Sequence, residues 1–199
     1  MLNNLLKTVQ TYAEEHKAIE EAYNQDKLQI AANYKGDLSK DQLAKATSRY
    51  TQSLQALKER TRNEIDSDVK ATKSAIKAVI AKPLTSEQLN IIQTSKLMNE
   101  GNKLTRIEKQ EIMNKCKDNY LATRMLVDLF GMEYSPINLH ADGLISRIDD
   151  AVKLINDSVI NAKGFTSDRS SFTSAFVLKG DIINSVQTDV SSFVESFSE

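Results

Sequence analysis

Residues 2–42 read LNNLLKTVQTYAEEHKAIEEAYNQDKLQIAANYKGDLSKDQ, and this stretch decides the fold class of the 199-residue chain. Nine positions recur in it at alternating steps of three and four residues, and all but two of them are apolar or aromatic. They are Leu2, Leu5, Val9, Tyr12, His16, Ile19, Tyr23, Asp26 and Ile30. This heptad-like seam predicts a long helix with a narrow contact stripe.

The residues after this seam predict a sharp reversal into a second long helix. Gly36 suits the left-handed position at a helix end, and Ser39 with Gln42 predicts a capping box that starts the next helix. The second seam consists of Leu43, Thr47, Tyr50, Leu54, Leu57 and Thr61, and then slips through Ile65, Val69, Thr72, Ile76 and Val79. Pro83 ends this helix, because proline disfavours helical backbone in the residue before it. A short connection between two such helices predicts an antiparallel hairpin over residues 1–82.

Residues 84–131 predict a bundle of three short helices. Thr85 with Gln88 and Thr105 with Glu108 form two capping boxes, and we expect the helix that begins at Thr105 to continue through Cys116.

A loop at Met132–Gly143 is expected to lead to C-terminal helices over residues 142–199, which pack on the rest of the chain or on a partner. The first has a stripe at Ile145, Ile148, Val152, Ile155 and Val159. The second has the same three-four spacing, interrupted at Lys179-Gly180, in Phe172, Phe176, Ile183, Val186, Val190, Phe193 and Phe197. The sequence has only six Gly and two Pro, and no Val/Ile-rich run in it reads convincingly as a strand. The predicted fold class is all-α: a long antiparallel helical hairpin followed by a bundle of shorter helices.

Charge and hydropathy limit the classes of partner. The formal net charge is −1, and residues 1–82 carry 14 Lys/Arg against 11 Asp/Glu, whereas residues 132–199 carry 5 against 10. Binding to a phosphate backbone needs a concentrated basic face, so nucleic acid is not expected as the main partner. No stretch has the ~20 apolar residues of a membrane span, and no signal peptide is evident. We therefore expect a cytoplasmic protein without membrane contact.

No catalytic, metal-binding or cofactor-binding motif is found in the sequence, and no cofactor is expected. His16 and Glu20 lie one turn apart, but a di-metal bundle would require a second such pair. His16 is interpreted as a polar residue that sets the helix register, with a partner contact or a metal ligand as alternatives. Cys116 is interpreted as a buried structural thiol. The helices around Asn119, Thr123 and Arg124 could imitate a helix-turn-helix, but no basic flank accompanies them, which favours bundle packing.

Aromatic side chains are the best candidates for contacts with a partner. A two-helix coil buries only one face of each helix, so large rings at its seam need further helices, from this chain or from another copy. A stripe of phenylalanines near the C-terminus also needs further helices to cover it. The candidate partner-binding residues are Tyr12, His16, Tyr23, Tyr50, Phe172, Phe176, Phe193 and Phe197.

Residues 104–130 read LTRIEKQEIMNKCKDNYLATRMLVDLF and combine a helix cap, a Lys-Asp-Asn-Tyr turn and an Arg-Met-Leu run. This segment resembles small helical structural proteins of tailed bacteriophages that infect Gram-positive bacteria. The resemblance implies a virion-associated or capsid-assembly role and transfers no catalytic residues. Capsid or other virion proteins would then be the partners, and the protein would be located in the host cytoplasm or in the virion.

The leading functional hypothesis is a non-enzymatic helical assembly protein that binds other protein chains and forms homo-oligomers. The alternative is a helical regulatory or nucleic-acid-associated module. An enzyme with a site that the sequence does not reveal is the weakest hypothesis.

Overall fold

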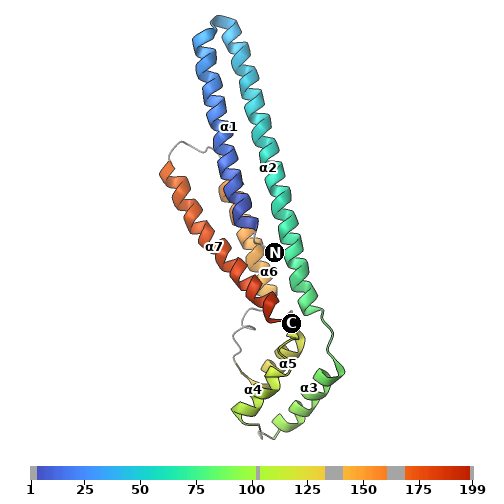
Figure 1. Ribbon diagram of the computed structural model, residues 1–199. Helices are drawn as coiled ribbons and strands as arrows, with labels where there is room; N and C mark the ends of the chain where they lie inside the picture. The colour runs from blue at the N-terminus through green and yellow to red at the C-terminus, as the bar shows by residue number, and fades with distance from the viewer. Residues whose placement is uncertain (1–3, 102–103, 133–140, 161–168, 198–199) are drawn as a thin grey trace. The chain divides into compact units, whose positions relative to one another are not determined.

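The structure, a computed structural model, describes residues 4–101, 104–132, 141–160 and 169–197, with side chains described except at 158, 159 and 169–179 (Figure 1). The helices are α1 (Leu5–Asn33), α2 (Gly36–Ile80), α3 (Ser86–Asn99), α4 (Arg106–Asn114), α5 (Tyr120–Phe130), α6 (Ala141–Ile155) and α7 (Arg169–Ser196). A π-helical turn, Asn156–Ile160, follows α6 directly. The described residues contain no strand, which confirms the all-α class.

The chain divides into two compact units. One comprises Val69–Ala151 with Asp181–Glu199, and the other comprises Leu2–Asp68 with Val152–Gly180. Helices α2, α6 and α7 each contribute to both units.

No described helix is long and apolar enough to cross a membrane.

Helix α1 and the first part of α2 form the predicted antiparallel hairpin (Figure 1). Gly36 adopts the expected left-handed conformation, with φ of 62°. The predicted capping box at Ser39 is wrong, because α2 begins at Gly36 and Ser39 lies inside it. The left-handed glycine reverses the chain within two non-helical residues, and Asp37 then places its negative charge at the positive end of the helix dipole.

The predicted seam of α1 is confirmed over the described residues. Leu5, Val9, Tyr12, His16 and Ile30 are buried, and the seam positions between His16 and Ile30 are half-buried.

The seam of α2 is confirmed only in part. Leu57, Thr61 and Ile65 are buried, but Leu43 and Thr47 are exposed. Ala46 is buried near the turn instead, one helical turn before the half-buried Tyr50. The contact face of α2 thus passes through Ala46 and Tyr50 near the hairpin turn.

Helices α3, α4 and α5 form a small bundle. Both predicted capping boxes, at Thr85 and at Thr105, are present. The core of the bundle consists of Ile92, Leu104, Met113, Cys116, Ala122, Leu126 and Phe130. Helix α4 ends at Asn114, so the prediction that it continues through Cys116 is wrong. Cys116 lies in the following turn and is nevertheless fully buried.

One expectation about the C-terminal helices is also wrong. Helix α6 begins at Ala141, so the last residues of the predicted Met132–Gly143 loop are helical, while 133–140 lie outside the described residues. Helix α7 is continuous across Lys179-Gly180, where the apolar spacing of the sequence is interrupted. A single glycine costs a helix only about 1 kcal/mol, which packing readily offsets.

The buried stripe of α6 is shifted from its predicted position. Leu144 and Ala151 are buried beside Ile148 and Ile155, whereas the predicted Ile145 and Val152 are half-buried. Val159, the last predicted member, lies outside the described side chains.

Candidate functional site

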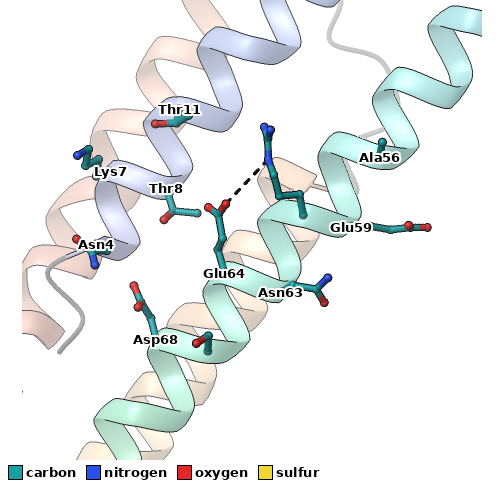
Figure 2. Close-up of a pocket in the computed structure, with 11 residues that line it drawn as sticks. Asn4, Lys7, Thr8, Thr11, Ala56, Glu59, Asn63, Glu64 and Asp68 are labelled. Atoms are coloured by element: carbon teal, nitrogen blue, oxygen red, sulfur yellow. Dashed lines mark ion pairs between the residues drawn. The ribbon is translucent and has the colours of Figure 1, made fainter.

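An open polar groove of about 860 Å³ lies between α1 and α2 (Figure 2). It lies within one compact unit, and we call it the hairpin groove. Its lining residues are mostly polar and are spaced one helical turn apart on each wall. They are Asn4, Lys7, Thr8 and Thr11 on α1, and Ala56, Glu59, Arg60, Asn63, Glu64, Ser67 and Asp68 on α2. In Figure 2, Glu64 and Asp68 extend from α2 toward α1.

Arg60 is the central charge of the groove. Its guanidinium pairs with Glu15 across the hairpin and lies 3.9 Å from the carboxylate of Glu64, one turn further along α2. All three side chains are about half exposed. Exposed pairs of this kind contribute at most about 1 kcal/mol each. The Glu15–Arg60 pair joins α1 to α2 and so helps to fix their register, while adding little stability.

An aromatic clasp, consisting of Tyr23, Lys27, Thr47 and Tyr50, joins the helices nearer the turn. The rings of Tyr23 and Tyr50 stack with centroids 4.5 Å apart and planes at 19°. The hydroxyls of Tyr23 and Thr47 are hydrogen bonded at 3.0 Å, and the Lys27 ammonium lies 5.4 Å from the centre of the Tyr23 ring. Tyr23 and Tyr50 remain half-buried, so one side of the clasp faces solvent.

Tyr12 and His16 are interior residues of the hairpin. Their rings lie 5.8 Å apart, and Tyr12 is only 1% exposed. Burial raises the pKa of Tyr12 to about 12, partly opposed by the nearby Arg62 charge. Burial, reinforced by the Lys58 ammonium, lowers the pKa of His16 and favours the neutral imidazole. No group of three His, Cys, Asp or Glu side chains suited to a metal ion occurs among the described residues.

Two of the C-terminal phenylalanines, Phe193 and Phe197, lie in the other compact unit. Phe193 and Phe197 are buried, and their rings pack edge-on against Tyr120, with centroids 5.2 Å and 5.4 Å away. Phe172 and Phe176 lie in α7, but their side chains fall outside the described residues. The sequence reasoning missed Tyr120 as a contact because nothing in its local pattern links it to residues more than 70 positions away.

The residues considered for reading DNA have structural roles. The Asn119 side chain accepts a hydrogen bond from the backbone N–H of Ala122 and so caps α5. The Thr123 hydroxyl bonds to the carbonyl oxygens of Cys116 and Asn119. Both side chains are buried, which leaves only Arg124 of the three exposed.

Cys116 is not placed for nucleophilic chemistry. It is fully buried, and desolvation, with the negative charges of Asp118 and Glu87, raises the pKa of its thiol. A raised pKa disfavours the reactive thiolate.

No protein-family model, no curated protein and no solved structure matches the chain.

Proposed function

We propose that this chain is a non-enzymatic helical protein that assembles with other protein chains, through the turn end of its hairpin, and that its setting is the assembly of a tailed-phage particle. The observation that carries the proposal is a gathering of exposed apolar side chains around the α1–α2 turn. Leu28 is 73% exposed, Leu38 is 55% exposed, and Tyr34 and Leu43 are exposed as well. Exposed apolar surface that gathers in one region is typical of interaction sites.

The aromatic clasp and the Asp26–Arg49 ion pair, at 3.1 Å, support this role. These contacts fix the register of α1 and α2 close to the turn. A pre-organised end loses less conformational entropy when it binds a partner. The phage setting rests on the resemblance of residues 104–130 alone.

The test compares two sets of substitutions at exposed apolar residues. Leu28→Ser with Leu38→Ser alters the hairpin end, and Leu97→Ser with Ile107→Ser is the control, since those side chains are 71% and 76% exposed on α3 and α4. The tagged chain should co-sediment with density-gradient-purified phage particles from its source cells. The hairpin-end variant should lose this association, and the control should keep it.

Equal association of both variants would show that the hairpin end is not the contact. Absence of the natural chain from purified particles and from their assembly intermediates would refute the phage setting. Salt-sensitive retention of the chain on DNA would support the nucleic-acid alternative instead.

A further inference from the structure

We propose that the partner bound at the hairpin end is an acidic amphipathic helix, which packs along α2 beside the aromatic clasp. This inference rests on the proposed assembly function and specifies the chemistry of the partner at that same site. The surface combines two neighbouring features, a shallow hollow on α2 and the solvent side of the clasp.

The hollow lies along α2 close to the turn and has a volume of about 770 Å³, and we call it the α2 hollow. Its lining residues are all exposed on one side of α2. They are Lys40, Leu43, Ala44, Thr47, Ser48, Thr51 and Gln52. Residues 40–52 extend about 18 Å along the helix axis, which is enough for about three turns of a partner helix.

The α2 hollow is continuous with the aromatic clasp through Thr47. The Thr47 side chain lines the hollow, and its hydroxyl is hydrogen bonded to the Tyr23 hydroxyl at 3.0 Å. The Lys27 ammonium in turn lies 5.4 Å from the centre of the Tyr23 ring. Lys27 therefore borders this surface from α1, while Lys40 and the 40% exposed Leu43 line it on α2.

The charge of the hairpin end indicates an acidic partner. Residues 23–50 carry five Lys/Arg against three Asp/Glu, a net charge of +2, whereas the rest of the chain carries 21 against 24, a net charge of −3. All three carboxylates of residues 23–50 are already in ion pairs within the hairpin. These pairs are Asp26–Arg49, Asp37–Lys40 and Asp41–Lys45.

Two lysines of the hairpin end are left for a partner. Lys27 and Lys35 are exposed, and neither forms an ion pair with a carboxylate in the part of the chain that the structure describes. Opposite charges across an interface steer the encounter and select the partner, so carboxylates on the bound helix complement these lysines. Because the charges are exposed, binding should weaken as the salt concentration rises.

The apolar side chains require that the partner be amphipathic. A purely acidic segment would leave Leu43 and the rings of the clasp in contact with water. A helix with leucines on one face and glutamates at the edges of that face can cover the α2 hollow and reach the lysines.

The first experiment measures the binding of two synthetic helical peptides to the full-length chain by fluorescence anisotropy. Both peptides are about 18 residues long, because shorter isolated helices are marginal in water, and both have the same face of leucines. One carries glutamates at its charged positions, and the other carries lysines there. The chain should bind the glutamate peptide about tenfold more tightly at low salt, because the lysine peptide replaces attraction by repulsion. Equal affinity for the two peptides, or no binding of either at millimolar concentration, would overturn the proposal.

The second experiment reverses the charges on the chain. Lys27→Glu with Lys35→Glu breaks no ion pair of the hairpin and should shift the preference to the lysine peptide. Lys7→Glu with Lys70→Glu is the matched control, since it changes the net charge equally at exposed lysines of α1 and α2 away from the turn. The control should keep the preference for the glutamate peptide, and circular dichroism should show unchanged helix content in both variants. An equal effect of both variants would reflect net charge alone and would refute the proposed site.

Other occupants of this surface would give different results. Tighter binding to phosphatidylcholine–phosphatidylglycerol vesicles or to duplex DNA than to the glutamate peptide would assign the lysines to a membrane or to nucleic acid. A dimer of the chain alone in sedimentation velocity, dissociated by Lys27→Glu with Lys35→Glu, would assign the surface to a second copy. Each of these results would overturn the acidic helix as the partner.

The outcomes also separate this inference from the proposed function. A chain that associates with particles through its hairpin end but binds both peptides equally would refute the acidic partner alone. A chain that prefers the glutamate peptide but never associates with particles would refute the phage setting alone.

Discussion

Replacing Phe193 by alanine should be among the most destabilising single changes in α7. The ring is 1% exposed, and removal of a buried phenylalanine ring typically costs 3–5 kcal/mol. It also makes two edge-on contacts, with Tyr120 at 5.2 Å and with Phe197 at 5.5 Å between ring centroids. Such pairs contribute about 0.5–1.5 kcal/mol beyond the buried area. We expect the free energy of unfolding to fall by about 4 kcal/mol.

Urea denaturation followed by far-ultraviolet circular dichroism measures this loss by linear extrapolation. Ile182→Ala is the matched control, because Ile182 lies on the same helix but is 46% exposed. Ile182→Ala should lower the free energy of unfolding by less than about 1 kcal/mol. A double-mutant cycle with Tyr120→Leu should then give a coupling of about 1 kcal/mol between the two rings. The reasoning fails if Phe193→Ala costs no more than Ile182→Ala, since the cluster would then not form in solution.

Three further changes test other parts of the chain. Gly180→Ala should raise stability by about 0.5–1 kcal/mol in thermal unfolding, because among the described side chains a Cβ there would meet only the Cδ1 atom of Leu6, at 3.7 Å. Asn119→Ala should lower stability by about 2 kcal/mol in urea, because the side chain accepts a hydrogen bond from the N–H of Ala122 and donates to two carbonyl oxygens of the α2–α3 connection. Asn119→Asp should keep the bond from Ala122 and lose the two donated bonds. The lowered pKa of His16 means that the unfolded chain takes up the proton first as the pH falls below about 6.5. Stability should therefore fall in mild acid, and His16→Gln should flatten this part of the pH–stability curve.

Several local features were determined by the sequence by itself. The heptad spacing of α1 identified its buried face, because side chains three and four residues apart lie on one side of a helix. The capping boxes at Thr85 and Thr105 marked two helix starts, since each satisfies backbone N–H groups within four residues. Such interactions are short in sequence and can be read directly from it.

Only the tertiary structure decided how distant segments meet. The sequence did not reveal that Tyr120 packs against Phe193 and Phe197, or that the α1 and α2 walls enclose a polar groove centred on Arg60. Gly180 reads locally as a helix break, yet α7 continues through it because packing along the helix outweighs a propensity cost of about 1 kcal/mol. Local propensities differ by about this amount, whereas burying one large side chain contributes two or three times as much, so long-range packing decides wherever the two conflict.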